Sequence, residues 1–167
     1  MPINRLNHAV LYVRDAERSA QFYVDNLGFK RIDAYEMIPN GAFLRAEGST
    51  NDHDLALFGI GDAVADSPAG RSAVGLYHLA WEVDTLADLQ RLGEKLSRVG
   101  AMVGATDHGT TRAVYAKDPD GIEFELTWII PAALLTDADT PTSKPLNLQA
   151  DLERFGADTL GGVGVSR

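Results

Sequence analysis

Residues 4–13 read NRLNHAVLYV, and residues 76–83 read LYHLAWEV. From residue 6 to 13 apolar and polar residues alternate loosely, with one face formed by Leu6, His8, Val10 and Tyr12 and the other by Ala9, Leu11 and Val13. The second stretch is similar, and each stretch carries one histidine, His8 in the first and His78 in the second. Loose alternation predicts a strand, and the return of such a strand with its histidine indicates an internal repeat. A further strand, expected near residues 122–129, carries Glu125. Two histidines and one carboxylate on three strands suggest a metal site.

Outward from these strands, the two parts of the chain follow the same order. A helix is expected after each histidine strand, with Asp15 as N-cap and Gly28 as stop in the first case. In the second case Asp84 or Thr85 is the cap and Gly100 the stop, and the apolar stripe consists of Leu86, Leu89, Leu92 and Leu96. Extended stretches follow each helix, near 29–37, 42–47 and 54–60, and near 101–105, 112–117 and 122–129. The sequence therefore predicts an α+β fold in which two βαβββ units pair into a curved mixed sheet that encloses one metal.

The boundaries follow from the same pattern and from changes in composition. We expect a first unit at 3–60, a connecting loop rich in Gly, Pro, Ser and Asp at 61–75, and a second unit at 76–131. Residues 118–121, DPDG, predict a hairpin turn within the second unit. Residues 132–167 form a C-terminal extension in which only 146–155 regains helical spacing.

Bulk properties exclude several functions. The net charge is −9 and the 15 basic residues are scattered, so a nucleic-acid partner is not expected. No apolar run reaches the roughly 20 residues of a membrane span, and no signal peptide is evident. We therefore expect a cytoplasmic location and do not expect a membrane partner. Because the chain has no cysteine, any metal must be held by nitrogen and oxygen.

The histidines also have a simpler interpretation. A single histidine in a strand is usually a hydrogen-bonded core residue. Equivalent positions in a repeat favour ligands instead, because pseudo-twofold pairing of the units would bring His8 and His78 to one cleft. Glu125 lies on the polar face of its strand, which on a plain surface would simply be hydrated. On a concave sheet that carboxylate needs a compensating charge, and a divalent cation would supply it.

Residues 106–125 read TDHGTTRAVYAKDPDGIEFE and resemble the signature of type I extradiol ring-cleavage dioxygenases, which belong to the vicinal oxygen chelate superfamily. The signature combines a histidine, an apolar residue followed by tyrosine, an acidic residue before proline, a glycine and a glutamate. The superfamily resemblance covers roughly residues 3–130. The preference for Glu125 over Glu123 as the carboxylate rests partly on this resemblance.

The resemblance implies a role for each candidate residue. His8, His78 and Glu125 would be the metal ligands, and Fe(II) would be the metal, with Mn(II) as the alternative. His108 and Tyr115 would hydrogen-bond the oxygens of the substrate, and His53 would act as acid and base. The implied partners are a small aromatic diol and O₂, and the superfamily suggests a homo-oligomer. One departure is that a single histidine, His53, stands where some relatives have two adjacent ones.

Two other functions remain open. Glyoxalase-like isomerases and lyases of the superfamily usually place a fourth ligand on the last strand of the first unit, whereas residues 55–58 here are all apolar. This difference favours extradiol cleavage of a catechol by a three-ligand site. A metal-free protein that sequesters a small molecule, such as a drug, would use the same cleft. In that case the set of His8, His78 and Glu125 would be a coincidence. Taken singly, His53 has the alternative of a solvated loop residue, and Tyr115 that of an ordinary residue of an amphipathic strand.

Overall fold

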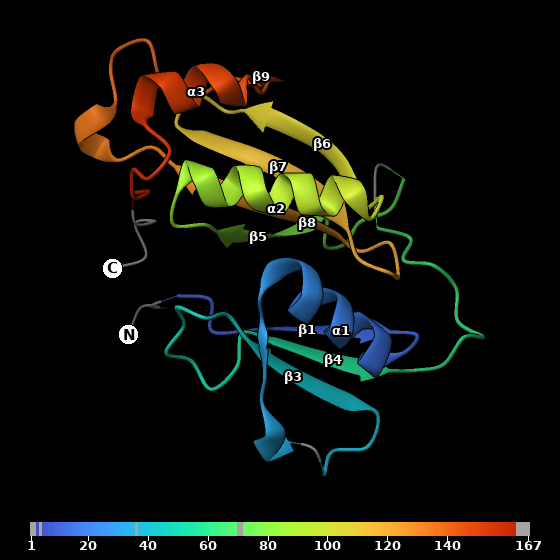
Figure 1. Cartoon of the computed structure of the whole chain (residues 1–167). Helices are drawn as coiled ribbons and strands as arrows, with labels where there is room; N and C mark the ends of the chain where they lie inside the picture. Colours follow the sequence, from blue (N-terminus) through green and yellow to red (C-terminus); the bar gives the residue numbers. More distant parts are fainter. Residues whose placement is uncertain (1–2, 4, 36, 70–71, 163–167) are drawn as a thin grey trace. The chain divides into compact units, whose positions relative to one another are not determined.

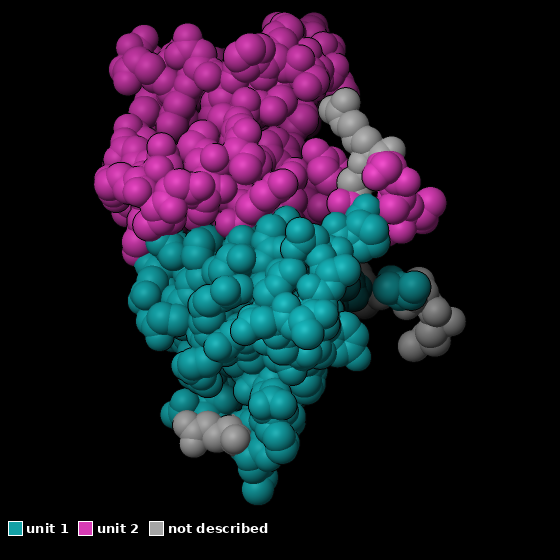
Figure 2. All heavy atoms as spheres, turned by 90° about the vertical axis from the view of Figure 1, so that its right-hand side faces the viewer, with its two compact units in different colours: residues 1–68, 118–122 teal, residues 69–117, 123–167 magenta. Residues whose placement is uncertain are grey.

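The computed structural model describes residues 3, 5–35, 37–69 and 72–162. The chain folds into two compact units, shown in separate colours in Figure 2. Unit 1 comprises residues 1–68 together with the turn at 118–122, and unit 2 comprises 69–117 and 123–167. Parts of the expected 3–60 unit, the 61–75 loop and the 132–167 extension, namely residues 4, 36, 70, 71 and 163–167, lie outside the described residues.

Unit 1 is a mixed four-stranded sheet with one helix on its face. The strands are β1 (Ala9–Val13), β2 (Lys30–Arg31), β3 (Gly41–Arg45) and β4 (Leu55–Gly59), and they lie in the order β1-β4-β3-β2. β1 runs parallel to β4, and β3 runs antiparallel to both β4 and β2. Helix α1 (Ala16–Leu27) contacts β3 and β4 (Figure 1). The buried apolar residues of this unit include Val13, Ala20, Tyr23, Leu44, Leu55 and Leu57.

The ends of α1 confirm the sequence interpretation. The carboxylate of Asp15 accepts hydrogen bonds from the backbone N–H groups of Glu17 and Arg18, which otherwise lack partners at a helix start. Gly28 follows with φ 78°, a conformation that costs glycine little. On β1 the expected two faces are also present, because Leu11 is buried whereas Tyr12 is 73% exposed.

The strand expected at 29–37 is wrong in extent. β2 covers only Lys30–Arg31, and a 3₁₀ turn, η1 (Asp33–Tyr35), follows it. The physical reason lies in Tyr35, whose ring stacks on Phe43 of β3 with centroids 4.4 Å apart. The 3₁₀ turn, in which the N–H of Tyr35 donates to the carbonyl of Ile32, places the ring there, so strand pairing ends before the turn.

Unit 2 is a mixed five-stranded sheet covered by two helices. The strands are β5 (His78–Glu82), β6 (Met102–Asp107), β7 (Thr111–Lys117), β8 (Glu123–Ile129) and β9 (Lys144–Pro145), in the order β5-β8-β7-β6-β9. β5 and β8 are parallel, and the other pairs are antiparallel. Helix α2 (Leu86–Arg98) has Thr85 as its N-cap. Its expected apolar stripe is buried on the sheet and consists of Leu86, Leu89, Leu92 and Leu96.

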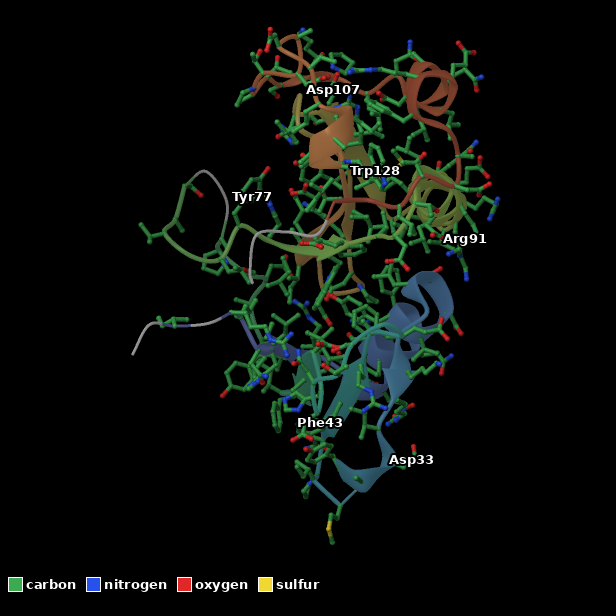
Figure 3. All side chains as sticks on the ribbon, turned by 90° about the vertical axis from the view of Figure 1, so that its left-hand side faces the viewer. Asp33, Phe43, Tyr77, Arg91, Asp107 and Trp128 are labelled. Atoms are coloured by element: carbon green, nitrogen blue, oxygen red, sulfur yellow. The ribbon has the colours of Figure 1, made fainter. Side chains whose placement is uncertain are left out.

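The C-terminal extension is part of unit 2. It contains a 3₁₀ turn, η2 (Ala132–Leu134), the short strand β9 on the edge of β6, and helix α3 (Leu148–Phe155), which contacts α2 (Figure 1). Buried Arg112 forms a 2.8 Å ion pair with Asp151 of α3 and another with Asp107 of β6. The fully buried Trp128 packs against Phe155, and Figure 3 shows its position inside this unit. The extension therefore completes the core.

The turn at Asp118–Ile122, predicted from its DPDG sequence, belongs to unit 1. Gly121 has φ 81°, and its N–H donates to the carbonyl of Asp118, which confirms a tight turn. The carboxylate of Asp118 accepts hydrogen bonds from the N–H groups of Asp120 and Ile122, and from the hydroxyl of Tyr23 on α1 at 3.3 Å. Burial raises the pKa of Asp118 and that of Tyr23, so the tyrosine remains a neutral donor.

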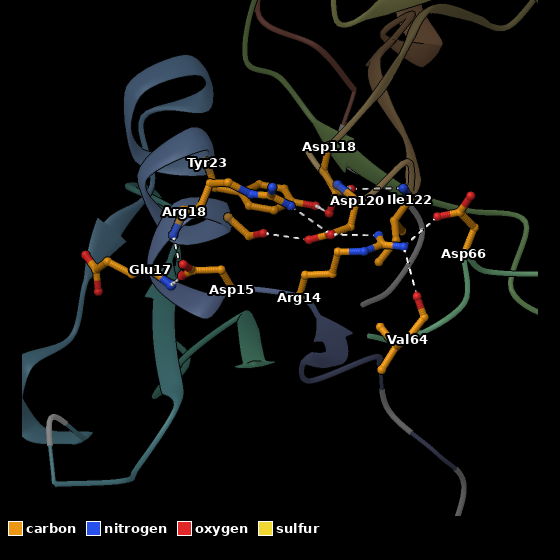
Figure 4. A network of polar contacts seen from close by, with 11 residues as sticks. Arg14, Asp15, Glu17, Arg18, Tyr23, Val64, Asp66, Asp118, Asp120 and Ile122 are labelled. Atoms are coloured by element: carbon orange, nitrogen blue, oxygen red, sulfur yellow. Dashed lines mark hydrogen bonds and ion pairs between the residues drawn. The ribbon is translucent and has the colours of Figure 1, made fainter. Parts of the chain in front are cut away.

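Asp120 carries the second half of this network (Figure 4). Its carboxylate, 5% exposed, accepts from Arg14 at 3.1 Å, from Arg18 at 2.8 Å and from the hydroxyl of Ser19 at 3.1 Å. Arg14 in turn contacts the carboxylate of Asp66 at 2.6 Å. Charged hydrogen bonds thus connect the turn at Asp118–Ile122 to the first turn of α1 and to Arg14 just before it.

No helix in the described part of the chain is both long and apolar enough to span a bilayer.

Candidate metal centre

Unit 1 brings His8 and His53 together. His8 lies directly before β1 and His53 shortly before β4, and these strands are parallel with Ala9 opposite Leu55. Both histidines therefore lie at the same end of a strand pair, and their ring centroids are 4.4 Å apart. The Nδ1 atom of His8 lies 2.8 Å from the side-chain oxygen of Asn7. The predicted ligand and the predicted acid–base residue of this unit are thus neighbours.

His53 is half-buried in an aromatic corner. Phe43 and Tyr35 approach its ring edge to face, with centroid distances of 5.2 and 5.8 Å. Burial lowers the pKa of His53, and the neighbouring His8 lowers it further. The Nδ1 atom of His53 is buried and has no hydrogen-bond partner among the described residues. At neutral pH this imidazole is therefore uncharged and able to accept a proton.

Two residues that sequence reasoning missed hold these histidines in place. The buried carboxylate of Asp54 accepts hydrogen bonds from the backbone N–H of Ala46, the hydroxyl of Ser49 and the amide of Asn51. The Asn51 amide also donates to the carbonyl of Asn7, next to His8. The run NDHD at 51–54 could have signalled this role, because Asn and Asp side chains in a turn are typical of such local bracing.

Unit 2 brings His78 and Glu125 together. Glu125 of β8 lies opposite Ala80 of β5 in the parallel register, two positions after His78. Both side chains are on one face, and the distance from His78 Nε2 to Glu125 Oε2 is 3.1 Å. The exposed side-chain fractions are 24% and 12%, respectively. The pair is therefore sheltered but reachable from solvent.

Tyr115 and His108 extend this cluster. Tyr115 of β7 is the cross-strand partner of Glu125, and its ring lies 5.6 Å from that of His78. Its hydroxyl lies 2.8 Å from His108 Nε2. Burial, followed by the charge of Glu125 and a hydrogen bond to it, raises the pKa of Tyr115 to about 12. The phenol is therefore protonated throughout the physiological range and can donate a hydrogen bond.

The donor atoms of the pair suit a divalent metal. Two adjacent ligand atoms of an octahedral ion, each about 2.1 Å from it, lie about 3 Å apart. The 3.1 Å separation of His78 Nε2 and Glu125 Oε2 agrees with this value. One nitrogen and one carboxylate oxygen are also the donor types that Fe(II) and Mn(II) accept. Two of the three predicted ligand residues are thus spaced as the ligands of one ion would be.

The predicted ligands are divided between the two units. His8 belongs to unit 1, while His78 and Glu125 belong to unit 2. Within the ranges that the structure describes, no group of three or more His, Asp or Glu side chains is gathered closely enough to hold an ion. The structure therefore brings the candidates together as two clusters. One contains His8 and His53, and the other contains His78, Glu125, Tyr115 and His108.

Comparisons with known proteins agree with this fold. The family model described as Glyoxalase/Bleomycin resistance protein/Dioxygenase superfamily matches residues 5–126. A catechol-2,3-dioxygenase of Bacillus subtilis is 33% identical over 124 residues, covering 72% of this chain and 40% of its own length. A lactoylglutathione lyase of Neisseria meningitidis is 29% identical over 137 residues, covering 72% of this chain and 88% of its own.

Solved structures give the same result for the fold. A glyoxylase/bleomycin resistance protein/dioxygenase domain from Frankia sp. superimposes with a TM-score of 0.61 at 20% identity, covering 78% of this chain and 96% of that one. This confirms the expected vicinal oxygen chelate fold. The dioxygenase from Bacillus subtilis is much longer than the region it shares, since the chain spans about two fifths of it.

Proposed function

We propose that this chain, which belongs to the Glyoxalase/Bleomycin resistance protein/Dioxygenase superfamily, is a metal-dependent extradiol dioxygenase that opens the ring of a catechol-type substrate with O₂. The observation that carries the proposal is the pairing of His78 Nε2 with Glu125 Oε2 at 3.1 Å, beside the hydroxyl of Tyr115. The similarity to a catechol-2,3-dioxygenase supports the same reaction class.

The proposed ligands are His78 and Glu125 from unit 2 and His8 from unit 1. Fe(II) is the proposed metal and Mn(II) the alternative, because two imidazoles and one carboxylate leave coordination positions open for a substrate. Such an ion would hold the catechol and O₂ together and allow electron density to pass between them.

The protein's own side chains would handle the protons and orient the ring. His53 is uncharged at neutral pH, and because its Nδ1 is buried, Nε2 is the atom available to accept the proton that a catechol loses on binding. His108 and Tyr115 would hydrogen-bond the substrate oxygens, and the Tyr115 hydroxyl would turn its one hydrogen from His108 Nε2 to a substrate oxygen.

One experiment tests the reaction. Protein purified without oxygen and loaded with Fe(II) is mixed with catechol in air, and oxygen uptake is followed together with the absorbance of a yellow ring-cleavage product. We expect both signals to depend on the metal. Metal loading without either signal, across a panel of substituted catechols, contradicts the proposal.

A matched set of variants tests the ligands. His8→Ala, His78→Ala and Glu125→Ala should each lower the bound metal per chain, measured by elemental analysis. Glu94→Ala removes an exposed carboxylate of α2 and should leave the metal content unchanged. Glu123→Ala is the sharper comparison, since Glu123 lies opposite His78 and is the rival carboxylate. A loss of metal in Glu123→Ala but not in Glu125→Ala would exclude the proposed ligand set.

A glyoxalase-like isomerase or lyase is the second candidate. It is favoured by the lactoylglutathione lyase, whose length the chain almost fully spans. Against it, the residues of β4 at the corresponding place, Leu55, Ala56 and Leu57, are buried and apolar and cannot supply a further ligand. Assay of the metal-loaded protein with the hemithioacetal of methylglyoxal and glutathione, without O₂, distinguishes the two reactions. A metal-free binding protein would instead bind aromatic ligands in the presence of a chelator.

A further inference from the structure

The C-terminal extension lies against the proposed substrate-binding histidine. β9 pairs with β6 through Thr106 opposite Pro145 and Asp107 opposite Lys144. The residues just before β9 therefore run beside His108, the residue that follows β6. The family model ends at residue 126, so this contact is made by a segment outside the matched region.

His108 and Thr142 contact each other through two pairs of atoms. The backbone N–H of Thr142 donates to the carbonyl of His108 at 3.1 Å. In return, the carbonyl oxygen of Thr142 lies 3.3 Å from the Nδ1 atom of the His108 ring. The opposite ring nitrogen, Nε2, faces the hydroxyl of Tyr115 at 2.8 Å. Both nitrogens of this imidazole thus have a partner.

The chemistry of these partners fixes one proton. A carbonyl oxygen can only accept, so Nδ1 must carry the hydrogen of that contact. In the neutral ring Nε2 is then the acceptor. The hydroxyl of Tyr115 has one hydrogen and two acceptors within reach, His108 Nε2 and the carboxylate of Glu125. With Nδ1 protonated, His108 competes with Glu125 for that hydrogen.

We propose that the C-terminal extension is a positioning segment for His108, acting through the backbone carbonyl of Thr142. The carbonyl keeps the hydrogen on Nδ1 and fixes the plane of the ring, so that Nε2 is the only site of His108 that exchanges a proton with Tyr115 or with a substrate oxygen. The consequence for catalysis rests on the proposed function. The Nδ1-protonated tautomer of His108 does not depend on that function.

Gly109 allows the extension to approach this closely. It has φ 85°, and a Cβ atom at this position would lie 1.9 Å from the carbonyl oxygen of Thr140. Any side chain here would push the 140–142 segment away from His108. Gly100 in the same unit has φ 72° but no heavy atom within 4 Å of such a Cβ. Substitution at either glycine strains the backbone, but only substitution at Gly109 also disturbs the contact with the extension.

The test is ¹⁵N NMR of the imidazole rings in the metal-free chain of 167 residues, at a pH where they are neutral. The chain has four histidines, so His108→Gln assigns the signals of interest. We expect His108 to be the Nδ1-protonated tautomer, and to remain so in Tyr115→Phe, because Thr142 and not Tyr115 holds that proton. A ring protonated on Nε2 in the unaltered protein overturns the proposal without any variant having to fold.

Substitutions then test the role of the extension. Gly109→Ala should shift His108 away from the Nδ1-protonated form, whereas Gly100→Ala, with comparable backbone strain, should not. Thr142→Ala should also leave the tautomer unchanged, because it keeps the carbonyl. Equal tautomer shifts in Gly109→Ala and Gly100→Ala overturn the proposal.

The activity assay is read separately from the tautomer. If Fe(II)-loaded protein cleaves catechols, Gly109→Ala should lower kcat more than it changes KM. If no ring cleavage occurs at all, the proposed function is wrong, and the NMR result still decides whether Thr142 sets the tautomer of His108.

Discussion

Tyr115 and Glu125 face each other across β7 and β8 as direct cross-strand partners, which places a phenol beside the carboxylate proposed to bind the metal. The carboxylate is itself 3.1 Å from His78 Nε2, so three functional groups from three adjacent strands share one face of the sheet. This arrangement arises from strand register alone and does not depend on a loop.

The first prediction concerns this phenol. Tyr115→Phe should keep the metal but lower kcat about a hundredfold, because the substrate oxygen loses a donor that stays protonated up to a pKa of about 12. The measurement is steady-state ring cleavage together with metal content. Tyr12→Phe, altering a side chain of unit 1 that is 73% exposed, serves as the control. Unchanged kcat in Tyr115→Phe would show that Tyr115 plays no part in the reaction.

The second prediction concerns the dependence of stability on pH at His53. Burial lowers the pKa of its ring below that of an unfolded chain, so the unfolded state binds more protons just below pH 6.5. Stability should therefore decrease as the pH falls through about 6.5 towards the folded-state pKa. His53→Gln should flatten this part of the profile, as measured by urea unfolding between pH 5 and 8. Parallel profiles for the two proteins would contradict it.

The third prediction concerns the turn that is fastened to α1. Burial alone would raise the pKa of Asp120, but hydrogen bonds from Arg14 and Ser19 and the charge of Arg18 bring it below the usual value. Asp120→Asn should thus lower Tm by a few degrees at pH 7. The difference should shrink as the pH falls from about 4, where the carboxylate of the unfolded chain takes up a proton, through the lower pKa of Asp120 in the folded chain.

Asp66→Asn is the control for this network, since Asp66 also contacts Arg14 but its side chain is 88% exposed. Its Tm should stay close to that of the unaltered protein, because exposed ion pairs contribute little. If Asp66→Asn and Asp120→Asn shift Tm equally, burial is not what gives Asp120 its effect.

The fourth prediction concerns the buried guanidinium that binds the extension. Arg112 is 3% exposed, pairs with Asp107 and Asp151, and lies 5.7 Å from the ring of Phe155. Arg112→Met leaves two carboxylates without their cation and should cost about 3–5 kcal/mol of unfolding free energy. Denaturant unfolding measures this cost.

Arg91→Met provides the comparison for Arg112. Arg91 pairs with Asp88 on the surface of α2, where Figure 3 shows it, and its side chain is 63% exposed. Its removal should cost about 0.5 kcal/mol or less. A small effect for Arg112→Met as well would mean that its ion pairs contribute little to holding the extension.

The sequence predicted those parts of the fold that depend on local chemistry. The cap at Asp15, the stop at Gly28, the leucine stripe of α2 and the DPDG turn all follow from short-range rules, and the structure confirms them. The shortened β2 was not predictable in this way, because the stacking of Tyr35 on Phe43 joins residues from different elements.

In the candidate site, too, some residues could be predicted from sequence patterns and others could not. His78 and Glu125 could be singled out because the repeat and the signature mark them, and the structure places them 3.1 Å apart. Thr142 could not, since it acts through its backbone carbonyl on the ring of a residue far along the chain. A backbone carbonyl such as that of Thr142 leaves no trace in residue type.

The turn at Asp118–Ile122 also bears on how the repeat can be divided. Its flanking strands belong to unit 2, yet its carboxylates complete the polar contacts of α1. A fragment ending at Pro68 would leave the Tyr23 hydroxyl and the Arg18 guanidinium without these acceptors. The two halves resemble each other in sequence pattern, but the turn at Asp118–Ile122, which lies in the second half of the sequence, packs in unit 1. Expressed alone, the first half would therefore lack the turn that binds α1, and the second half would lack the α1 residues that bind the turn.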